Sequence, residues 1–193
     1  MTGGGRGQAL STEHRQSTFF KSYFNIPLSG DSIFRPRAPK LRIRERNMSS
    51  NHVDFDGDHG SHQSATRPES SLDGVRVLVI EDNALIRQAM ECLLTSWGCQ
   101  ITLADGALMA RDHVRRDQAP DIILSDYQLN DGYNGINAVR LVRELTGRQI
   151  PACLISADEN LVHQAEAAGV HYLHKSVPPA KLRSVMSGLL PAE

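Results

Sequence analysis

Several classes of protein are excluded by what this sequence of 193 residues lacks. No apolar run approaches the roughly 20 residues of a membrane-spanning helix, and residues 1–7 lack the apolar segment of a secretory signal. The net charge of −1 shows no basic excess, so we expect neither a membrane nor a nucleic acid as a direct partner. Three cysteines without a CxxC pair indicate reduced thiols and a cytoplasmic location. Aromatic residues make up only 5% of the chain, so the core must be built from aliphatic side chains.

The first 73 residues have too little patterned apolar sequence to form a core. They show no sustained period of 3.6 or of 2, and Gly, Ser and Asn cluster there. Such a segment cannot bury enough apolar surface to offset the entropy lost on ordering. We therefore expect residues 1–73 to be a disordered N-terminal extension and residues 74–193 to form one folded domain.

From residue 75 onward, short apolar runs rich in β-branched residues alternate with helical patterns. We expect strands at 75–80, 100–103, 122–125, 152–156 and 170–174. Helices are expected from Asn83 to Gly98, over 107–116, from Ile136 to Gly147, over 159–168 and from Pro179 onward. This alternation requires parallel pairing with right-handed crossovers. The predicted fold is α/β, a five-stranded, parallel, doubly wound (flavodoxin-like) sheet with helices on both faces.

Acidic residues follow two of the expected strands. Glu81 and Asp82 come after the first strand, and Asp126 comes after the third. The carboxyl ends of parallel strands lie along one edge of the sheet, where such folds bind ligands. Three carboxylates gathered there would repel one another, and a hard divalent cation such as Mg²⁺ would remove the repulsion. We predict a magnesium site formed by Glu81, Asp82 and Asp126.

A hydroxyl and an ammonium group join the same edge, because Ser156 ends the fourth strand and Lys175 follows the fifth. Beside a metal, the Asp126 carboxylate can attack phosphorus in line and form an acyl phosphate, while Lys175 neutralises charge on the transferring group. The Ser156 hydroxyl would then donate to the bound phosphoryl group, and the loop shift would let Tyr172 rotate into the vacated space. We predict Asp126, Lys175 and Ser156 as catalytic residues, with Ser156 and Tyr172 as the switch.

Five short motifs stand in a specific order along this half of the chain. They are Glu81-Asp82-Asn83, Leu124-Ser125-Asp126-Tyr127-Gln128-Leu129, Asp131-Gly132 with Gly135, Ile155-Ser156-Ala157, and Lys175. In this order they make residues 75–190 resemble the response-regulator receiver domains of two-component signalling, of which the bacterial chemotaxis regulator is the simplest member.

The resemblance implies a role for each of these positions. Asp126 would accept phosphate from a phosphohistidine on a histidine kinase or a phosphotransfer protein. Mg²⁺ would be bound by Asp82, Asp126 and the main-chain carbonyl of Gln128, with Glu81 acting through water. Ser156, Lys175 and Tyr172 would act as described above. The predicted function is phosphorelay signal transduction by a switch that catalyses only its own phosphorylation and dephosphorylation, and is not otherwise an enzyme.

Two features depart from the usual receiver pattern. The family usually places proline directly after the lysine, whereas Ser176 follows Lys175 here. The segment from Ser156 to Lys175 is short, which predicts a reduced fourth helix. This short helix, the loop 131–135 and the stretch 177–182 are similar to receiver modules at the C-termini of hybrid histidine kinases.

The resemblance also predicts where a four-helix phosphodonor would dock, namely on the first helix and on the loop after Lys175. The predicted docking residues are Leu85, Arg87, Met90, Val177 and Pro178. Because only three residues follow Leu190, we expect no C-terminal output domain, and a phosphorylation-dependent dimer stays open. Two alternatives remain. One is a detached receiver module or phosphate sink of a hybrid histidine kinase. The other is a Mg²⁺-dependent phosphohydrolase, although its usual Asp-x-Asp is replaced by Glu81-Asp82-Asn83.

Overall fold

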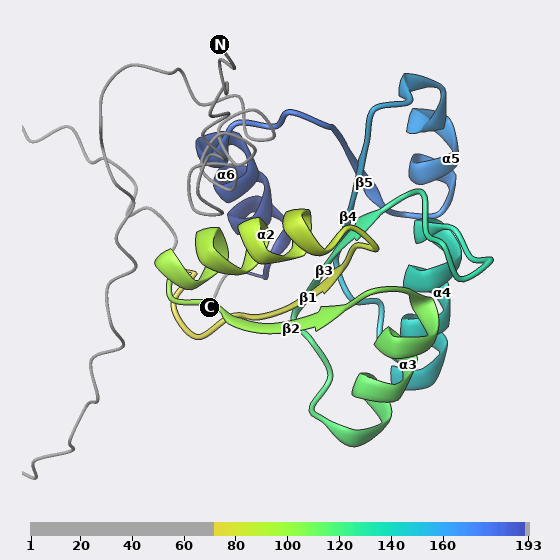
Figure 1. Cartoon of the computed structure of the whole chain (residues 1–193), viewed down its shortest axis with the longest axis horizontal. Coiled ribbons are helices and arrows are strands. Elements are labelled where there is room, and N and C mark those ends of the chain that lie inside the picture. Colours follow the sequence, from red (N-terminus) through yellow and green to blue (C-terminus); the bar gives the residue numbers. More distant parts are fainter. Residues whose placement is uncertain (1–71, 192–193) are drawn as a thin grey trace, which may run out of the picture.

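The computed structural model describes residues 72–191, which form an α/β domain (Figure 1). Its five strands are all parallel and lie in the order β2-β1-β3-β4-β5. Their bounds are β1 (Arg76–Ile80), β2 (Gln100–Ala104), β3 (Ile122–Asp126), β4 (Ala152–Ser156) and β5 (His171–His174). The predicted flavodoxin-like sheet is therefore confirmed, because this strand order is the one that defines that doubly wound fold.

A helix follows each strand, as the alternation predicted. They are α2 (Ala84–Ser96), α3 (Ala107–Arg116), α4 (Gly135–Thr146), α5 (Val162–Ala167) and α6 (Pro179–Leu189). The Asn83 side chain caps α2 by accepting from the main-chain N–H groups of Leu85 and Ile86. Gly147 ends α4 with a left-handed φ of 64°. The expected helix at 159–168 is instead a 3₁₀ turn, η1 (Glu159–Leu161), followed by the six residues of α5.

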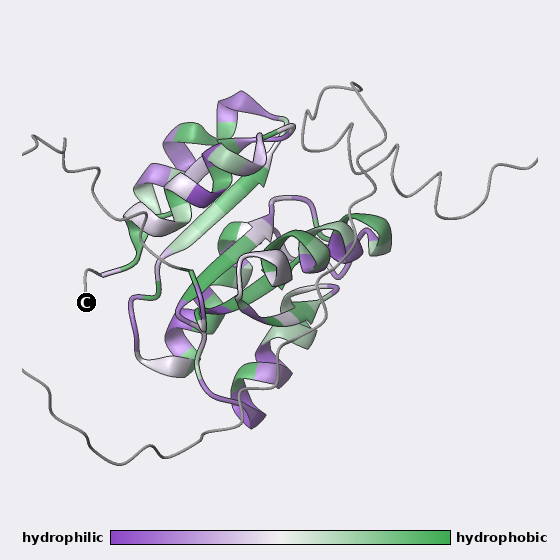
Figure 2. Cartoon of the chain, turned by 90° about the vertical axis from the view of Figure 1, so that its left-hand side faces the viewer, coloured by the Kyte–Doolittle hydropathy of each residue, from purple (hydrophilic) through white to green (hydrophobic). Residues whose placement is uncertain are grey.

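Helices cover both faces of the sheet in two layers. Helices α2 and α6 lie on one face, and α3, α4 and α5 lie on the other (Figure 1). The strands carry the apolar residues between these layers, and the polar residues lie on the outer helix surfaces (Figure 2). Each layer therefore buries one apolar stripe per helix against a sheet that is apolar on both sides.

Side-chain burial differs from the sequence-based expectation at two positions. The apolar period of α2 predicts Trp97 on the buried face, yet it is only partly buried. The apolar period of α4 likewise predicts Leu145 on the inner face, yet 39% of its surface is exposed. Trp97 is the C-cap of α2 and Leu145 lies in the last turn of α4, so the apolar period does not guarantee burial at the end of a helix.

The division of the chain into an extension and a domain stays a prediction, because residues 1–71 and 192–193 lie outside the described residues. Within the described part, Leu72 is 1% exposed and packs in the core under α2 and α6. The packed domain thus includes two residues before the expected start at 74. Among residues 72–191, every helix is too short or too polar to cross a lipid bilayer.

Candidate functional site

Three carboxylates meet at the carboxyl edge of the sheet, where β1 and β3 lie side by side. Asp126 is the last residue of β3, and Glu81 and Asp82 directly follow β1. Each offers one oxygen that lies within 4.8 Å of the other two. Glu81 and Asp126 are buried, with 4% and 6% of their surfaces exposed. The chain reverses its strand order here, since β1 is flanked by β2 on one side and β3 on the other.

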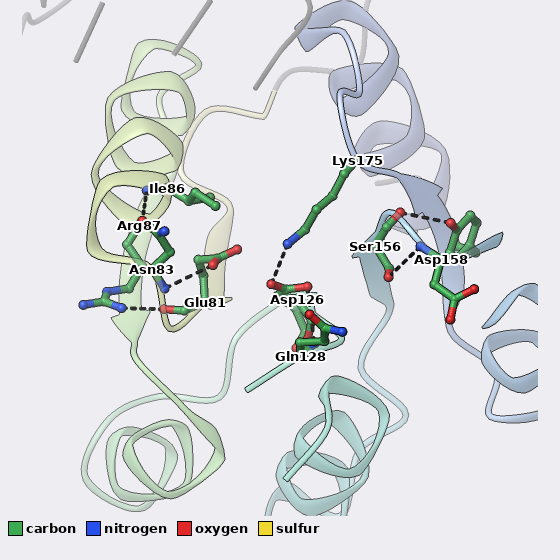
Figure 3. A network of polar contacts seen from close by, with 11 residues as sticks. Glu81, Asn83, Ile86, Arg87, Asp126, Gln128, Ser156, Asp158 and Lys175 are labelled. Atoms are coloured by element: carbon green, nitrogen blue, oxygen red, sulfur yellow. Dashed lines mark hydrogen bonds and ion pairs between the residues drawn. The ribbon is translucent and has the colours of Figure 1, made fainter. Parts of the chain in front are cut away.

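Lys175 enters this cluster from the loop after β5. Its Nζ lies 2.6 Å from Asp126 Oδ2, and 26% of its side chain is exposed (Figure 3). The other Asp126 oxygen, Oδ1, accepts from the main-chain N–H of Gln128 at 3.4 Å. Each oxygen of Asp126 therefore accepts from a different loop, which holds the carboxylate in one orientation.

The cluster carries more negative charge than one lysine can balance. The pKa of the Glu81 carboxyl is raised to about 7, mainly by burial and also by the negative charge of Asp126, while Lys175 opposes the increase. Mg²⁺ takes carboxylate and carbonyl oxygens as ligands and keeps several waters. The donor set of Glu81, Asp82 and Asp126 therefore fits a hard divalent cation, which would relieve this repulsion.

The loop after Asp126 is held close to the main chain of β3. Gly135 N–H donates to Tyr127 O at 2.8 Å, and Gln128 pairs with Asn134 in a short antiparallel bridge. A Cβ on Gly135 would collide with the main-chain oxygen of Asp126, so only glycine fits this position. The tight packing fixes the backbone at Gln128, whose carbonyl as a metal ligand stays a prediction.

Ser156 connects the site to β5 through its main chain. Its carbonyl accepts from the Tyr172 hydroxyl at 2.9 Å and from Lys175 N–H at 2.8 Å. Its own Oγ accepts from Asp158 N–H at 3.2 Å (Figure 3). The hydroxyl hydrogen of Ser156 is not used in that contact, so it can still be donated. Tyr172 and Lys175 thus both donate to the Ser156 carbonyl, so a displacement of Ser156 would change both hydrogen bonds.

The backbone after Lys175 turns at a serine that has a positive φ. All peptide bonds between residues 72 and 191 are trans, and Ser176 adopts a left-handed conformation with a φ of 74°. A left-handed turn at Ser176 therefore directs the chain from Lys175 into Val177. The ion pair between Lys175 and Asp126 therefore forms even though Ser176, and not proline, follows the lysine.

The predicted docking residues differ in their exposure to solvent. Leu85 is 48% exposed and Pro178 is exposed, as a docking contact requires. The prediction is wrong for Met90 and Val177, which are 2% and 4% exposed and pack in the core under α2 and α6. Met90 lies four residues, about one helical turn, after the buried Ile86, so it points to the sheet rather than to solvent.

Arg87 is half-buried, and its guanidinium contacts the site rather than pointing only to solvent. Its Nη1 donates to the main-chain oxygen of Glu81 at 2.6 Å. Sequence reasoning missed this contact and the constraint on Gly135. The available signals were an arginine one turn after the Asn83 cap and a glycine directly after the Asn134 cap.

Comparison with known proteins assigns this chain to a family. Residues 77–187 match the response regulator receiver domain family. The phosphate regulon transcriptional regulatory protein PhoB of Klebsiella pneumoniae is 31% identical over 124 residues, which are 60% of this chain and 53% of PhoB. The sensory/regulatory protein RpfC of Xanthomonas campestris is 25% identical over 169 residues, which are 84% of this chain and 22% of RpfC. The chain thus spans about half of PhoB and about a fifth of RpfC.

Solved structures agree with this match. The receiver domain of the sensor histidine kinase PA1611 from Pseudomonas aeruginosa, which has a magnesium ion coordinated in its active site cleft, is 28% identical. It has a TM-score of 0.54, and the match covers 60% of this chain and 97% of that one. The PhyR receiver domain of Erythrobacter litoralis is also 28% identical with a TM-score of 0.54, covering 63% and 95%. The Vibrio cholerae chemotaxis protein CheY4, 21% identical with a TM-score of 0.56 over 61% and 99%, shares the fold.

Proposed function

The chain belongs to the response regulator receiver domain family of two-component signalling, and we propose from this premise that Asp126 is its phosphoacceptor in a Mg²⁺-dependent switch. One observation carries the proposal. Asp126 lies between a cluster of carboxylates and the ammonium group of Lys175, whose Nζ is 2.6 Å from Oδ2. A structural ion pair would need only one carboxylate, whereas a phosphoryl site needs both a cation-binding cluster and a separate positive group.

The proposed reaction moves one phosphoryl group onto a carboxylate oxygen of Asp126. The P–N bond of a donor phosphohistidine breaks as the P–O bond forms, and the departing imidazole leaves with the bonding electron pair and a proton from solvent. Lys175 balances charge on the phosphoryl oxygens during transfer, because its ammonium group already lies beside the attacked carboxylate. The donor would be a histidine kinase or a histidine phosphotransfer protein.

Magnesium is proposed as the cofactor, held by Asp82, Asp126 and the main-chain carbonyl of Gln128, with Glu81 acting through water. When bound, the ion supplies positive charge that draws a phosphoryl oxygen to the site. The support is the compact oxygen cluster of this chain together with the magnesium ion in the related receiver of PA1611.

The switch is proposed to begin at Ser156. Its hydroxyl would donate to the phosphoryl group on Asp126, and the shift would strain the carbonyl contacts to Tyr172 and Lys175. Tyr172 is partly buried and packs against the core under α3, α4 and α5, so a rotation of its ring would change these apolar contacts. A local charge change would thereby alter the surface between β5 and α5.

Mass measurement of the intact chain tests the acceptor. Incubation with Mg²⁺ and a small acyl-phosphate donor should add the mass of one phosphoryl group, and chelation of Mg²⁺ should prevent it. Asp126→Asn should gain nothing, while Asp121→Asn, which changes an acidic residue outside the site, should gain it normally. A phosphoryl gain that persists in Asp126→Asn would refute the proposal.

The similarity to RpfC and PA1611 favours one setting for this switch. The chain would work as the receiver module or phosphate sink of a hybrid histidine kinase system, as an alternative to a response regulator that acts on a separate output partner. Phosphoryl transfer assayed from each candidate phosphohistidine donor would decide between them. Sustained hydrolysis of small phosphate esters with multiple turnovers would instead point to a phosphohydrolase.

A further inference from the structure

Arg87 joins the first turn of α2 to the peptide that carries the acidic pair. Its Nη1 lies 2.6 Å from the main-chain oxygen of Glu81, a short charge-assisted hydrogen bond. Figure 3 shows Arg87 on the Glu81 side of the cluster and Lys175 on the Asp126 side. Two cations from separate segments therefore bracket the proposed magnesium site, but they contact it differently, one through a main-chain carbonyl and one through a carboxylate.

The carbonyl of Glu81 belongs to the same planar peptide as the N–H of Asp82. Fixing this carbonyl therefore fixes the plane from which the Asp82 side chain projects. The same short segment is held at two more points, because Glu81 N–H donates to Ala104 O at 3.0 Å and Asn83 N–H donates to Glu81 Oε1 at 3.1 Å. Of the three contacts, only that of Arg87 acts on the peptide between the two acidic residues.

The location of Arg87 in the first turn of α2 is electrostatically unfavourable unless another contact compensates it. Side chains of a helix lean toward its N-terminus, so Arg87 reaches back over the first turn of α2, where the helix dipole is positive. A cation is destabilising there on its own. The short hydrogen bond to the Glu81 carbonyl offsets this cost and accounts for the direction of the guanidinium.

We propose that Arg87 is a positioning residue for the metal site, which holds the Glu81–Asp82 peptide so that both carboxylates face Asp126. The inference rests on the proposed magnesium site. It differs from the docking role predicted from the sequence, in which Arg87 contacts the phosphodonor and leaves metal binding untouched.

The two effects of removing Arg87 have opposite signs, which makes the proposal testable. Loss of a positive charge bound to the peptide that follows Glu81 would by charge alone tighten Mg²⁺ binding. Loss of the carbonyl anchor would weaken it, because residues that orient metal ligands typically contribute about 10- to 100-fold in affinity. A weaker affinity in Arg87→Ala therefore measures positioning and cannot arise from charge.

The experiment measures the Mg²⁺ dissociation constant of the whole chain by calorimetry. Arg87→Ala should raise it about 10-fold, and Arg87→Lys, which keeps the cation and one donor group, should recover part of the loss. Arg140→Ala, which removes an exposed arginine from α4, should leave it unchanged. Saturating Mg²⁺ should restore phosphorylation of Arg87→Ala by a small acyl-phosphate donor, because the acceptor itself is intact.

Three outcomes would separate the possibilities. Unchanged or tighter Mg²⁺ binding in Arg87→Ala would overturn the positioning role. If that result came with slower transfer from a phosphohistidine donor alone, Arg87 would be a docking residue. Wild-type binding of Mg²⁺ that is insensitive to Asp82→Asn would refute the proposed metal site itself, and the positioning role with it. Thermal unfolding without Mg²⁺ verifies that each variant is folded.

Discussion

At the scale of single residues, Ser176 holds the least favourable backbone conformation of the described chain outside glycine. Its φ of 74° lies in the left-handed region, where a side chain costs about 1 kcal/mol relative to glycine. The residue directly follows Lys175, whose Nζ contacts Asp126. The strain therefore lies next to a proposed catalytic residue, where the turn determines the direction of the lysine.

We predict that Ser176→Gly stabilises the protein by roughly 0.5–1 kcal/mol, because glycine adopts positive φ without a steric penalty. Ser176→Pro should destabilise it, since proline is confined to a φ near −65°. Urea unfolding of both variants measures the change in the free energy of unfolding. Ser184→Gly, the same substitution inside α6, serves as the control and should destabilise by about 0.5 kcal/mol. Stabilisation of both glycine variants would contradict an origin in backbone strain.

At the scale of elements, an arginine in α4 forms hydrogen bonds to the main chain at the end of the short helix α5. The Arg143 guanidinium donates to the main-chain oxygens of Ile150, Ala168 and Gly169 at 2.9–3.0 Å. Burial lowers the pKa of this guanidinium from its usual value. Helix α5 has only six residues and no side-chain N-cap, so its position depends on contacts of this kind.

Arg143→Met should lower the free energy of unfolding by about 1–3 kcal/mol, because the part-buried contacts to the carbonyls of Ile150 and Ala168 are lost while the methionine keeps the apolar stem. Amide hydrogen exchange should accelerate in α5 more than in α2. Arg140→Met, on the exposed side of the same helix, should change neither quantity. Equal acceleration in α2 and α5 would show that Arg143 has only a general effect on stability.

A second contact between elements joins the start of β1 to the turn before β3. Arg76 donates to Asp121 from Nε at 3.0 Å and Nη2 at 2.6 Å, and its main-chain N–H donates to the same carboxylate at 3.0 Å. These donors lower the pKa of the Asp121 carboxyl below its ordinary value. The ionised carboxylate thus stabilises the folded state, and this contribution is lost as pH falls through the lowered pKa.

The free energy of unfolding should therefore differ most between wild type and Asp121→Asn at neutral pH, by about 1–2 kcal/mol. The difference should shrink as the solution is acidified below the ordinary pKa of aspartate. Urea unfolding across this pH range measures it, with the exposed Asp117→Asn as control. A difference that grows at low pH would contradict the ion pair as its source.

At the scale of the whole molecule, binding of Mg²⁺ to the folded chain should raise its thermal stability. A ligand at 100 times its dissociation constant adds about 2.7 kcal/mol when it binds only the folded state. Addition of Mg²⁺ should raise the Tm of wild type, a chelator should reverse the rise, and Asp82→Asn should abolish most of it. Glu91→Gln, an exposed change on α2, should respond like wild type. Equal rises in all three proteins would indicate non-specific ion binding.

Most of the fold and the acidic cluster could be predicted from the sequence, because strand ends and helix caps are local signals. Alternating strands and helices leave only parallel pairing, and parallel pairing brings the ends of all strands to one edge. Asp126 and Lys175 are 49 positions apart, yet both follow strands, so their meeting was predictable. The burial of Leu72 could not be predicted, because it depends on packing across the sheet.

The amino-acid sequence by itself determined the order of elements and the chemistry at their ends, since periodicity, caps and charge are written along the chain. Only the tertiary structure decided which side chains reach the site and which are buried. Arg87 turns back to a carbonyl, Met90 and Val177 enter the core, and Gly135 lies against the backbone of Asp126. These outcomes depend on side-chain direction and on close packing between distant segments, which no local pattern encodes.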